Sequence, residues 1–257
     1  MPPLTIGIGA GERGEKVLEG ALSSGIRSGI TIYTAADRLV SPSPGVTYRI
    51  SPEPAEQMIA DLADGRIAAA VRGTLPANKT LSLLKRASGV ETLLRAALLE
   101  TPGGEKFLLA PVGVDEGWTV DQRIELANRA QTLAAKCGLK TKVGILSGGR
   151  FGDTGRHPEV DRSLADAELV ARMTGGEHYQ ILIEEAIRDC GVIIAPDGIS
   201  GNLIFRTLVF LGSGRGHGAP VLNISRVFID TSRATPDYAN ALRLAESLLK
   251  ETSWKIH

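Results

Sequence analysis

Several features that would assign a protein to a functional class are missing from this sequence of 257 residues. Its 29 Lys and Arg residues balance its 29 Asp and Glu residues, so the totals do not show the basic charge that is usual in nucleic-acid binders. No apolar run approaches the length of a membrane span. The N-terminal stretch turns from apolar to Gly-rich and charged, which is not the pattern of a signal peptide. We therefore expect a cytoplasmic protein that binds neither nucleic acid nor a membrane.

Cysteine and histidine are scarce, and the common catalytic motifs are absent. Cys137 and Cys190 end helical patterns just before apolar strand patterns, which favours small buried residues over a disulfide framework. The four histidines have no ligand spacing with Cys, Asp or Glu, so no metal is expected. There is no G-x-S-x-G motif and no P-loop, and the glycines at 7–11 do not match the dinucleotide-binding fingerprint. Covalent catalysis is not indicated, and a dinucleotide site has little support.

Strand and helix patterns alternate from one end of the chain to the other. This alternation predicts an α/β fold with largely parallel sheets. The clearest amphipathic helix covers 121–137, and one hairpin is expected around Pro102-Gly103-Gly104, between strands at 93–99 and 105–110. Further strands are expected at 4–8, 29–33, 67–71, 143–146, 192–195, 220–224 and 227–229. Further helices are expected at 15–22, from Ser51 to just before Gly65, and at 78–87, 161–173, 179–189, 201–211 and 236–250.

The segment from Val192 to Gly212 is the most informative part of the chain. An apolar strand breaks at Pro196-Asp197-Gly198 and leads into a helical pattern. In open α/β sheets, ligands bind where strands feed such turns at the carboxyl edge. Asp197, Ser200 and Asn202 are therefore candidate substrate-binding residues. The alternative is that the turn is only tight and that Ser200 or Asn202 only caps a helix.

Three other Gly-rich breaks follow predicted strands, and they bring further polar residues to the expected edge. They are Gly9-Ala10-Gly11, Arg72-Gly73-Thr74 and Ser147-Gly148-Gly149, the last followed by Arg150. If the strands are parallel, all four breaks lie on one edge of the sheet. Arg72, Thr74, Ser147 and Arg150 are thus candidates for binding an anion, because guanidinium groups bind phosphate bidentately. The alternative for each arginine is a solvated side chain or a pair with a neighbouring acid.

Five segments of the chain, taken in order, match one known family. They are IGIGAGERGEKVLEGALSSGI, APVGVDEGWTVDQRIELANRA, KVGILSGGRFGDTGRHPEVDRSLADAELVAR, APDGISGNLIFRTLVFLG and DTSRATPDYANAL. They resemble the phosphate acetyltransferase (phosphotransacetylase) and phosphate butyryltransferase family, and the matches run collinearly over most of the chain. Within the family, the short length and the last segment look most like a methanogen branch. Members of that branch are called MtxX or methanogenesis marker proteins and are described as methyltransferase-related or as predicted phosphotransacetylases.

The resemblance implies a two-domain α/β fold of the isocitrate and isopropylmalate dehydrogenase-like type. Domain one would comprise 1–140 with 223–257, and domain two 141–222, which would form a homodimer. The family holds coenzyme A and an acyl phosphate in a cleft between the domains, so the implied function is transfer of an acyl group between CoA and phosphate, or a close variant on a small anionic substrate. By the same resemblance, Ser232 and Arg233 match the Ser-Arg pair of the active site. Asp237 is the nearest candidate for the base, two residues earlier than in the family.

One loop departs from the family pattern. Where the family has SGAxHSTA, this chain has Val71-Arg72-Gly73-Thr74-Leu75-Pro76, without the histidine and with an arginine in place of a small residue. This change favours a second hypothesis, a methyltransferase-related accessory protein that binds an anionic ligand without acyl transfer. A third, a metal- and NAD-dependent dehydrogenase on the same fold, would need an Asp cluster that the sequence does not contain.

Overall fold

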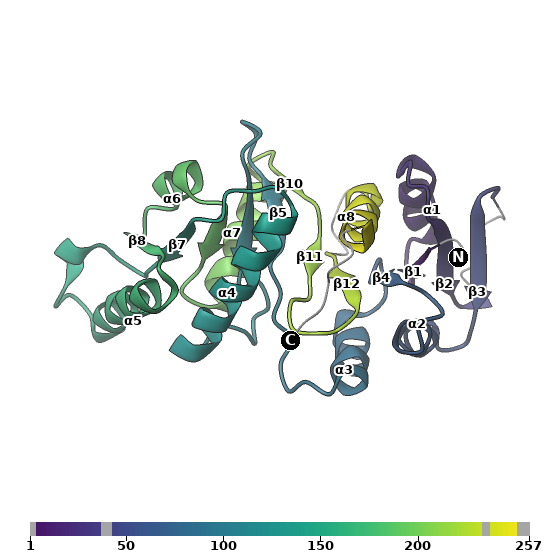
Figure 1. Cartoon of the computed structure of the whole chain (residues 1–257), viewed down its shortest axis with the longest axis horizontal. Coiled ribbons are helices and arrows are strands. Elements are labelled where there is room, and N and C mark those ends of the chain that lie inside the picture. The colour runs from purple at the N-terminus through teal and green to yellow at the C-terminus, as the bar shows by residue number, and fades with distance from the viewer. Residues whose placement is uncertain (1–3, 37–42, 233–236, 251–257) are drawn as a thin grey trace. The chain divides into compact units, whose positions relative to one another are not determined.

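A computed structural model describes residues 4–36, 43–232 and 237–250 of the chain. The described residues form two compact units (Figure 1). Unit 1 comprises the residues up to Leu93 and those from Gly218 onward, and unit 2 comprises Leu94–His217. Each unit is an α/β layer structure built on a six-stranded, mostly parallel sheet, as the alternating sequence pattern predicts. No helix in the described ranges combines the length and the apolar character needed to cross a membrane.

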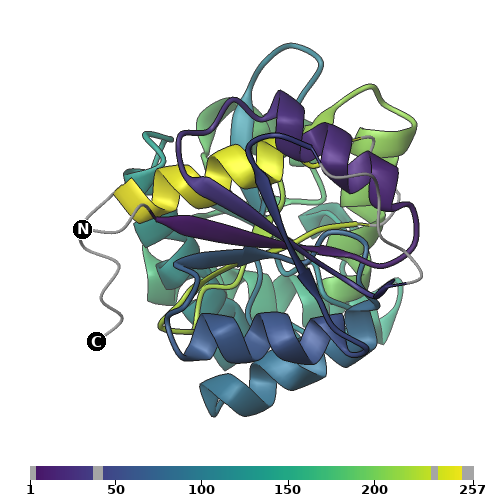
Figure 2. The same cartoon turned by 90° about the vertical axis from the view of Figure 1, so that its right-hand side faces the viewer.

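Unit 1 has the strand order β11-β12-β4-β1-β2-β3, and every pair is parallel except β11 with β12. Helices α1 and α8 cover one face of this sheet, and α2 and α3 cover the other (Figure 2). The strands are β1 (Thr5–Ala10), β2 (Gly29–Thr34), β3 (Val46–Ile50), β4 (Ala69–Val71), β11 (Ala219–Pro220) and β12 (Val227–Asp230). The helices are α1 (Gly14–Ser23), α2 (Pro54–Ala63), α3 (Ala77–Ser88) and α8 (Ala239–Lys250).

The chain reverses its direction across the sheet between β1 and β4. From β1 it winds through β2 and β3 toward one edge, and it then crosses back so that β4 pairs with the other side of β1. Both strands are buried at this point, and Ile6, Ile8 and Val71 are completely inaccessible. In doubly wound sheets, the crevice outside the carboxyl ends of two such strands is the usual ligand site. We therefore expect a ligand site of unit 1 at the carboxyl ends of β1, β4 and β12.

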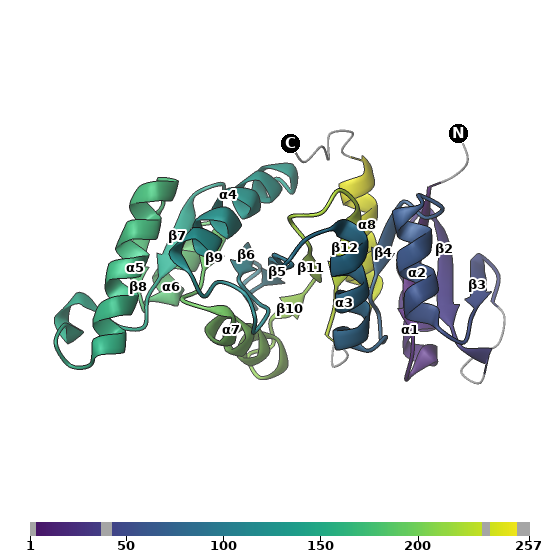
Figure 3. The same ribbon diagram turned by 90° about the horizontal axis from the view of Figure 1, so that it is seen from below.

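Unit 2 has the strand order β10-β5-β6-β9-β7-β8, in which β6, β9, β7 and β8 are parallel. Helices α4 and α5 pack on one face, and α6 and α7 on the other; α4 and α7 are separated by the sheet in Figure 3. The strands are β5 (Ala97–Glu100), β6 (Lys106–Ala110), β7 (Val143–Leu146), β8 (Glu177–Gln180), β9 (Val192–Ile194) and β10 (Arg215–Gly216). The helices are α4 (Val120–Lys136), α5 (Pro158–Thr174), α6 (Ile183–Asp189), α7 (Gly198–Phe210) and one 3-10 turn, η2 (Phe151–Asp153).

The boundary between the units differs from the predicted division into 1–140 with 223–257 and 141–222. The predicted hairpin of β5 and β6 exists, but β6 also pairs in parallel with β9, Leu108 opposite Val192. Strands β5 and β6 thereby belong to the second sheet, and α4 packs on it as well. The boundary lies at Leu94 instead of near 140, and the chain returns to unit 1 at Gly218.

Other elements also differ from the prediction. Strand β3 was not predicted, and the predicted strand at 220–224 is the short β11. The predicted helix at 179–189 is divided, because Glu177–Gln180 form β8 and the helix starts only at Ile183. Gln180 has a left-handed backbone, with φ of 57°, and the pairing register of β7 with β8 shifts beside it. This irregularity ends β8 and separates it from α6.

Candidate functional site

The four Gly-rich breaks do not share one edge. The turns after β1 and β4 lie at the carboxyl edge of the unit 1 sheet, and the turns after β7 and β9 lie at the carboxyl edge of the unit 2 sheet. The single-edge expectation was wrong because the parallel strands are divided between two sheets. Each edge is therefore described by itself.

In unit 1, the crevice between the ends of β1 and β4 is filled by the loop that follows β4. The side chain of Leu75 is buried there, so close to Gly9 that a Cβ on that glycine would lie 2.1 Å from Leu75 Cδ1. The backbone N–H of Thr74 donates to Gly9 O at 3.0 Å, and the N–H of Gly11 donates to Thr74 Oγ1 at 2.9 Å. Thr74, a candidate substrate-binding residue, thus binds the turn after β1. The loop after β4 is therefore packed against the turn after β1.

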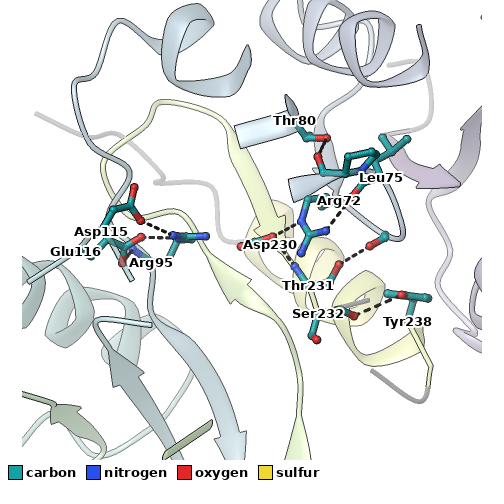
Figure 4. Close-up of polar contacts among 12 residues, drawn as sticks. Arg72, Leu75, Thr80, Arg95, Asp115, Glu116, Asp230, Thr231, Ser232 and Tyr238 are labelled. Carbon is teal, nitrogen blue, oxygen red and sulfur yellow. Dashed lines mark hydrogen bonds and ion pairs between the residues drawn. The ribbon is translucent and has the colours of Figure 1, made fainter. Parts of the chain in front are cut away.

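Arg72, the first residue after β4, lies in a buried ion pair (Figure 4). Its side chain is 5% exposed, its Nε donates to Asp230 Oδ1 at 2.5 Å and its Nη1 donates to Leu75 O at 2.9 Å. Asp230 is the last residue of β12, which pairs with β4. The alternative that the sequence left open for each arginine, a pair with an acid, is therefore realised for Arg72.

The predicted catalytic residues follow β12. Thr231 is buried, and its Oγ1 donates to Gly73 O at 3.0 Å. Ser232 comes next and is half-buried, and its main-chain oxygen accepts a hydrogen bond from Tyr238 Oη at 3.4 Å. Asp237 is exposed, and its Oδ1 accepts a hydrogen bond from the N–H of Ala239 at 2.7 Å, at the start of α8. Arg233 lies outside the described residues.

In unit 2, the predicted binding residues of the turn after β9 make structural contacts. Asp197 caps α7: its Oδ1 accepts from the N–H of Ser200 at 2.8 Å, and its Oδ2 accepts from Ser200 Oγ at 3.1 Å. Asn202 Nδ2 donates to Val112 O at 2.9 Å. Both contacts fix the position of α7, the second by joining it to the loop after β6. The residue that caps the helix is therefore Asp197, and not Ser200 or Asn202.

Glycine is required where α7 packs against the loop after β6. A Cβ on Gly198 would lie 1.6 Å from Gly113 O, and a Cβ on Gly201 would lie 1.9 Å from Pro111 O. These distances are far below a van der Waals contact, so no other residue fits without moving the backbone. The glycines of the P-D-G-I-S-G-N turn therefore serve the close approach of the helix and the loop.

A second buried ion pair, which the sequence patterns do not reveal, fixes the same loop. Glu116 is fully buried, and its Oε1 accepts from Arg95 Nε at 2.5 Å, while Arg95 also pairs with Asp115 at 3.3 Å (Figure 4). Burial raises the pKa of the Glu116 carboxyl above its ordinary value, and the Arg95 guanidinium opposes that rise. The two charges stand 21 positions apart, outside any local spacing that a sequence motif could show.

Ser147 and Arg150 follow β7. The hydroxyl of Ser147 is buried and donates to Gly149 O at 3.0 Å. It also lies 2.9 Å from His178 Nε2, and His178 Nδ1 lies 3.4 Å from Glu168 Oε2. Ser147 is 2% exposed, so this Ser–His–Glu chain links β7, β8 and α5 and offers no accessible nucleophile. Arg150 is exposed and remains available to an anion. Within residues 4–36, 43–232 and 237–250, no group of three or more His, Cys, Asp or Glu side chains could hold a metal ion.

The chain is similar in sequence to some known proteins and similar in fold to others. No model of a known protein family matches the chain. The chain is 46% identical over 205 residues to a Methanosarcina mazei protein named "Putative methyltransferase mtx subunit X", covering 77% of this chain and 73% of that one. A branched-chain phosphotransacylase from Enterococcus faecalis has a similar structure, with a TM-score of 0.75, 18% identity and coverage of 96% and 99% of the two chains. A 4-hydroxythreonine-4-phosphate dehydrogenase from Klebsiella pneumoniae has a TM-score of 0.63, 12% identity and coverage of 96% and 100%.

Proposed function

The chain belongs to the family of methanogen proteins named methyltransferase mtx subunit X, and from its phosphotransacetylase-like fold we propose that it is a phosphate acyltransferase. It moves an acyl group between coenzyme A and inorganic phosphate, or between close variants of these two substrates. The observation that carries the proposal is the segment after β12, where half-buried Ser232 follows the firmly held Asp230 and Thr231 at the carboxyl edge of a parallel sheet.

The chemistry follows from the side chains that the family resemblance aligns. The thiol of CoA gives its proton to a carboxylate, for which Asp237 is the candidate, and the thiolate attacks the acyl carbon of an acyl phosphate. The bond from that carbon to the phosphate oxygen breaks, the acyl thioester forms, and the phosphate leaves and takes up the proton. Arg233 stabilises the negative charge on the phosphate, and Ser232 donates a hydrogen bond to the transferring group. Arg150, with its exposed side chain, is a further candidate contact for the anion.

A second function is favoured by the loop after β4. In this loop the arginine pairs with Asp230, and Thr74 and Leu75 fill the crevice beside β1. The side chains of Arg72, Thr74 and Leu75 all make contacts within unit 1, whereas an acetyltransferase would use this loop to bind its substrate. An accessory protein of a methyltransferase, binding an anionic ligand without acyl transfer, would need no more than the Ser232-Arg233 segment. The names of the methanogen relatives agree with this alternative.

We also propose that the protein is a homodimer whose subunits meet through α7. This helix is apolar around most of its circumference, yet only two glycines in it are buried, and Leu203 and Leu211, the latter just past its end, are 60% and 83% exposed. Its single charged residue is Arg206, whose Cζ lies 5.2 Å from the centroid of the Phe210 ring, and every other side chain of the helix is uncharged. A Leu203→Glu variant should shift the mass measured by light scattering to that of a monomer; an unchanged mass would refute this surface.

One assay tests the proposed reaction. Purified protein receives inorganic phosphate with acetyl-, propionyl- or butyryl-CoA, and loss of the thioester is followed. We expect turnover in the wild type and a loss of at least about 100-fold in Arg233→Ala. Arg226→Ala is the matched control, because Arg226 precedes β12 where Arg233 follows it, and its Nη2 donates to Ala63 O; it should retain wild-type turnover. Absence of turnover with every acyl-CoA would refute acyl transfer, and calorimetric titration with CoA and phosphate would then test the accessory function.

A further inference from the structure

Arg72 is held at two points inside unit 1. The guanidinium group is buried, and it donates from Nε to Asp230 and from Nη1 to the main-chain oxygen of Leu75. The first contact reaches the neighbouring strand β12, and the second returns to the loop of Arg72 itself. A buried charge pair of this kind is costly to break, because removal of one partner leaves the other charge uncompensated.

The carboxylate that Arg72 binds also holds the chain after β12. Asp230 Oδ1 accepts a hydrogen bond from the N–H of Thr231 at 2.9 Å, in addition to the one from Arg72. The hydroxyl of Thr231 returns to Gly73, the residue next to Arg72, at 3.0 Å. Two links therefore join the loop after β4 to the segment after β12. One is the ion pair of Arg72 with Asp230, and the other is the hydrogen bond from the buried hydroxyl of Thr231 to Gly73.

Ser232 stands at the end of this connected segment. Thr231, the residue before it, is fixed by the two links, and the main-chain oxygen of Ser232 accepts a hydrogen bond from Tyr238 Oη. Thr231 is 6% exposed, whereas Ser232 is half-buried. The chain thus passes from a buried residue, Thr231, to a partly exposed one, Ser232, at the position where the resemblance places the Ser-Arg pair of the active site.

We propose that Arg72 is a positioning residue of the transferase site, which fixes the main chain of Ser232 through Asp230 and Thr231 and does not itself bind the substrate anion. The inference rests on the proposed function, because it takes Ser232 and Arg233 as the pair that meets the substrate. A displacement of about 1 Å in such a pair is enough to reduce a rate by about 100-fold. Lysine cannot replace Arg72, since a single ammonium group lacks the planar fork that reaches both acceptors.

The test is a double-mutant cycle on turnover, with the full-length chain, phosphate and the best acyl-CoA substrate. Arg72→Lys and Asp230→Asn should each lower kcat about 10- to 100-fold, and the KM for phosphate should change less than about threefold. The double variant should be no slower than the slower single variant, because both changes break one unit. If Arg72 bound the anion instead, Arg72→Lys would raise KM and Asp230→Asn would leave kcat near the wild-type value. That result would overturn the proposal.

Arg123→Lys is the matched control for the loss of a buried arginine contact. Arg123 is 3% exposed and donates from Nη2 to Asp166 at 2.7 Å, joining α4 to α5 in unit 2. As in Arg72→Lys, a buried arginine that pairs with an aspartate is replaced by lysine. We expect this variant to melt at a lower temperature and to keep the wild-type kcat. An equal loss of kcat in Arg123→Lys would assign the effect of Arg72→Lys to general destabilisation and would overturn the positioning role.

Hydrogen exchange tests the positioning role of Arg72 without relying on acyl transfer. In Arg72→Lys, the amides of residues 230–232 should exchange about tenfold faster than in the wild type, while the amides of β1 and β2 keep their protection. Unchanged exchange at 230–232 would refute positioning, whether or not the protein turns over acyl-CoA. Faster exchange in a protein without turnover would support positioning of this segment and refute only acyl transfer.

Discussion

Gly9→Ala is the substitution that most directly tests how the carboxyl edge of unit 1 is built. The added Cβ would lie 2.1 Å from Leu75 Cδ1 and 2.7 Å from Arg72 O. The leucine side chain can turn, but the carbonyl belongs to a loop that is bonded to Gly9 and Gly11. We therefore expect overpacking to lower the free energy of unfolding by about 1–3 kcal/mol. For a chain of this length, that corresponds to a fall in Tm of roughly 2–12 °C.

The assay is differential scanning calorimetry of the full chain, with three further variants. Leu75→Ala alone should cost about 2–5 kcal/mol through the cavity that it leaves. The combined Gly9→Ala and Leu75→Ala variant should lose less than the sum of the two, since the new methyl group enters that cavity. Gly152→Ala is the control: a Cβ added there would have nothing within 4 Å, and the φ of Gly152 is ordinary, so its effect should be within about 0.5 kcal/mol. A Gly9→Ala protein with wild-type Tm and weakened phosphate binding would refute the reasoning, because the glycine would then serve a ligand.

Substitutions at three other residues test single contacts. In the wild type, burial opposes ionisation of Glu246, but hydrogen bonds from Lys250 and from two amides before β2 outweigh it and lower the pKa of the carboxyl to about 2. Glu246→Gln should therefore lower the free energy of unfolding by up to about 3 kcal/mol at pH 7. Urea titrations should show the difference between wild type and variant vanish as the pH falls from about 5 through 2. Asp197→Ala should cost about 1 kcal/mol by thermal melting through loss of the cap of α7, and Asp197→Asn should cost less. Tyr33→Phe removes the 2.7 Å hydrogen bond to buried Asp61 and should cost about 1–3 kcal/mol, and no change in the urea midpoint would contradict that role.

Strands in the middle of each sheet could be predicted from the sequence, whereas the edge strands β3, β8 and β10 could not, and the edge strand β11 was predicted too long. Strands β1, β4, β7 and β9 are buried on both faces, so their sequences are continuous apolar runs. The edge strand β3 is half exposed, and β8 has the sequence EHYQ with one buried residue. An edge strand forms because a neighbouring backbone offers hydrogen bonds, and a sequence window does not contain that neighbour. The unit boundary escaped prediction for a related reason, since no change of composition marks the point where β5 and β6 join the second sheet.

The turn after β9 shows how far the candidate site could be predicted. The position of the turn and the start of α7 follow from Pro196, Asp197 and Gly198, because these residue types have strong local preferences. The partners of Asn202 and Gly201 do not follow, since they lie in the loop after β6, about 90 positions earlier in the chain. Local preferences therefore locate a turn at a sheet edge, and only the packed structure shows whether its polar groups meet a ligand or a neighbouring loop.

The same distinction explains why Arg72 suggested an anion site in the sequence. A basic residue at the carboxyl end of a buried strand is evidence for a bound anion only if no acid ends the neighbouring strand. Asp230 ends β12 and stands 158 positions away, and the pairing of β12 with β4 brings the two together. Between β4 and β12 the chain runs through the whole of unit 2 and returns to unit 1 at Gly218, so the adjacency of the two strands depends on the order of all the strands in unit 1. Because each charge would be costly to bury alone, the pair itself constrains that order, and it does so where the segment leading to Ser232 begins.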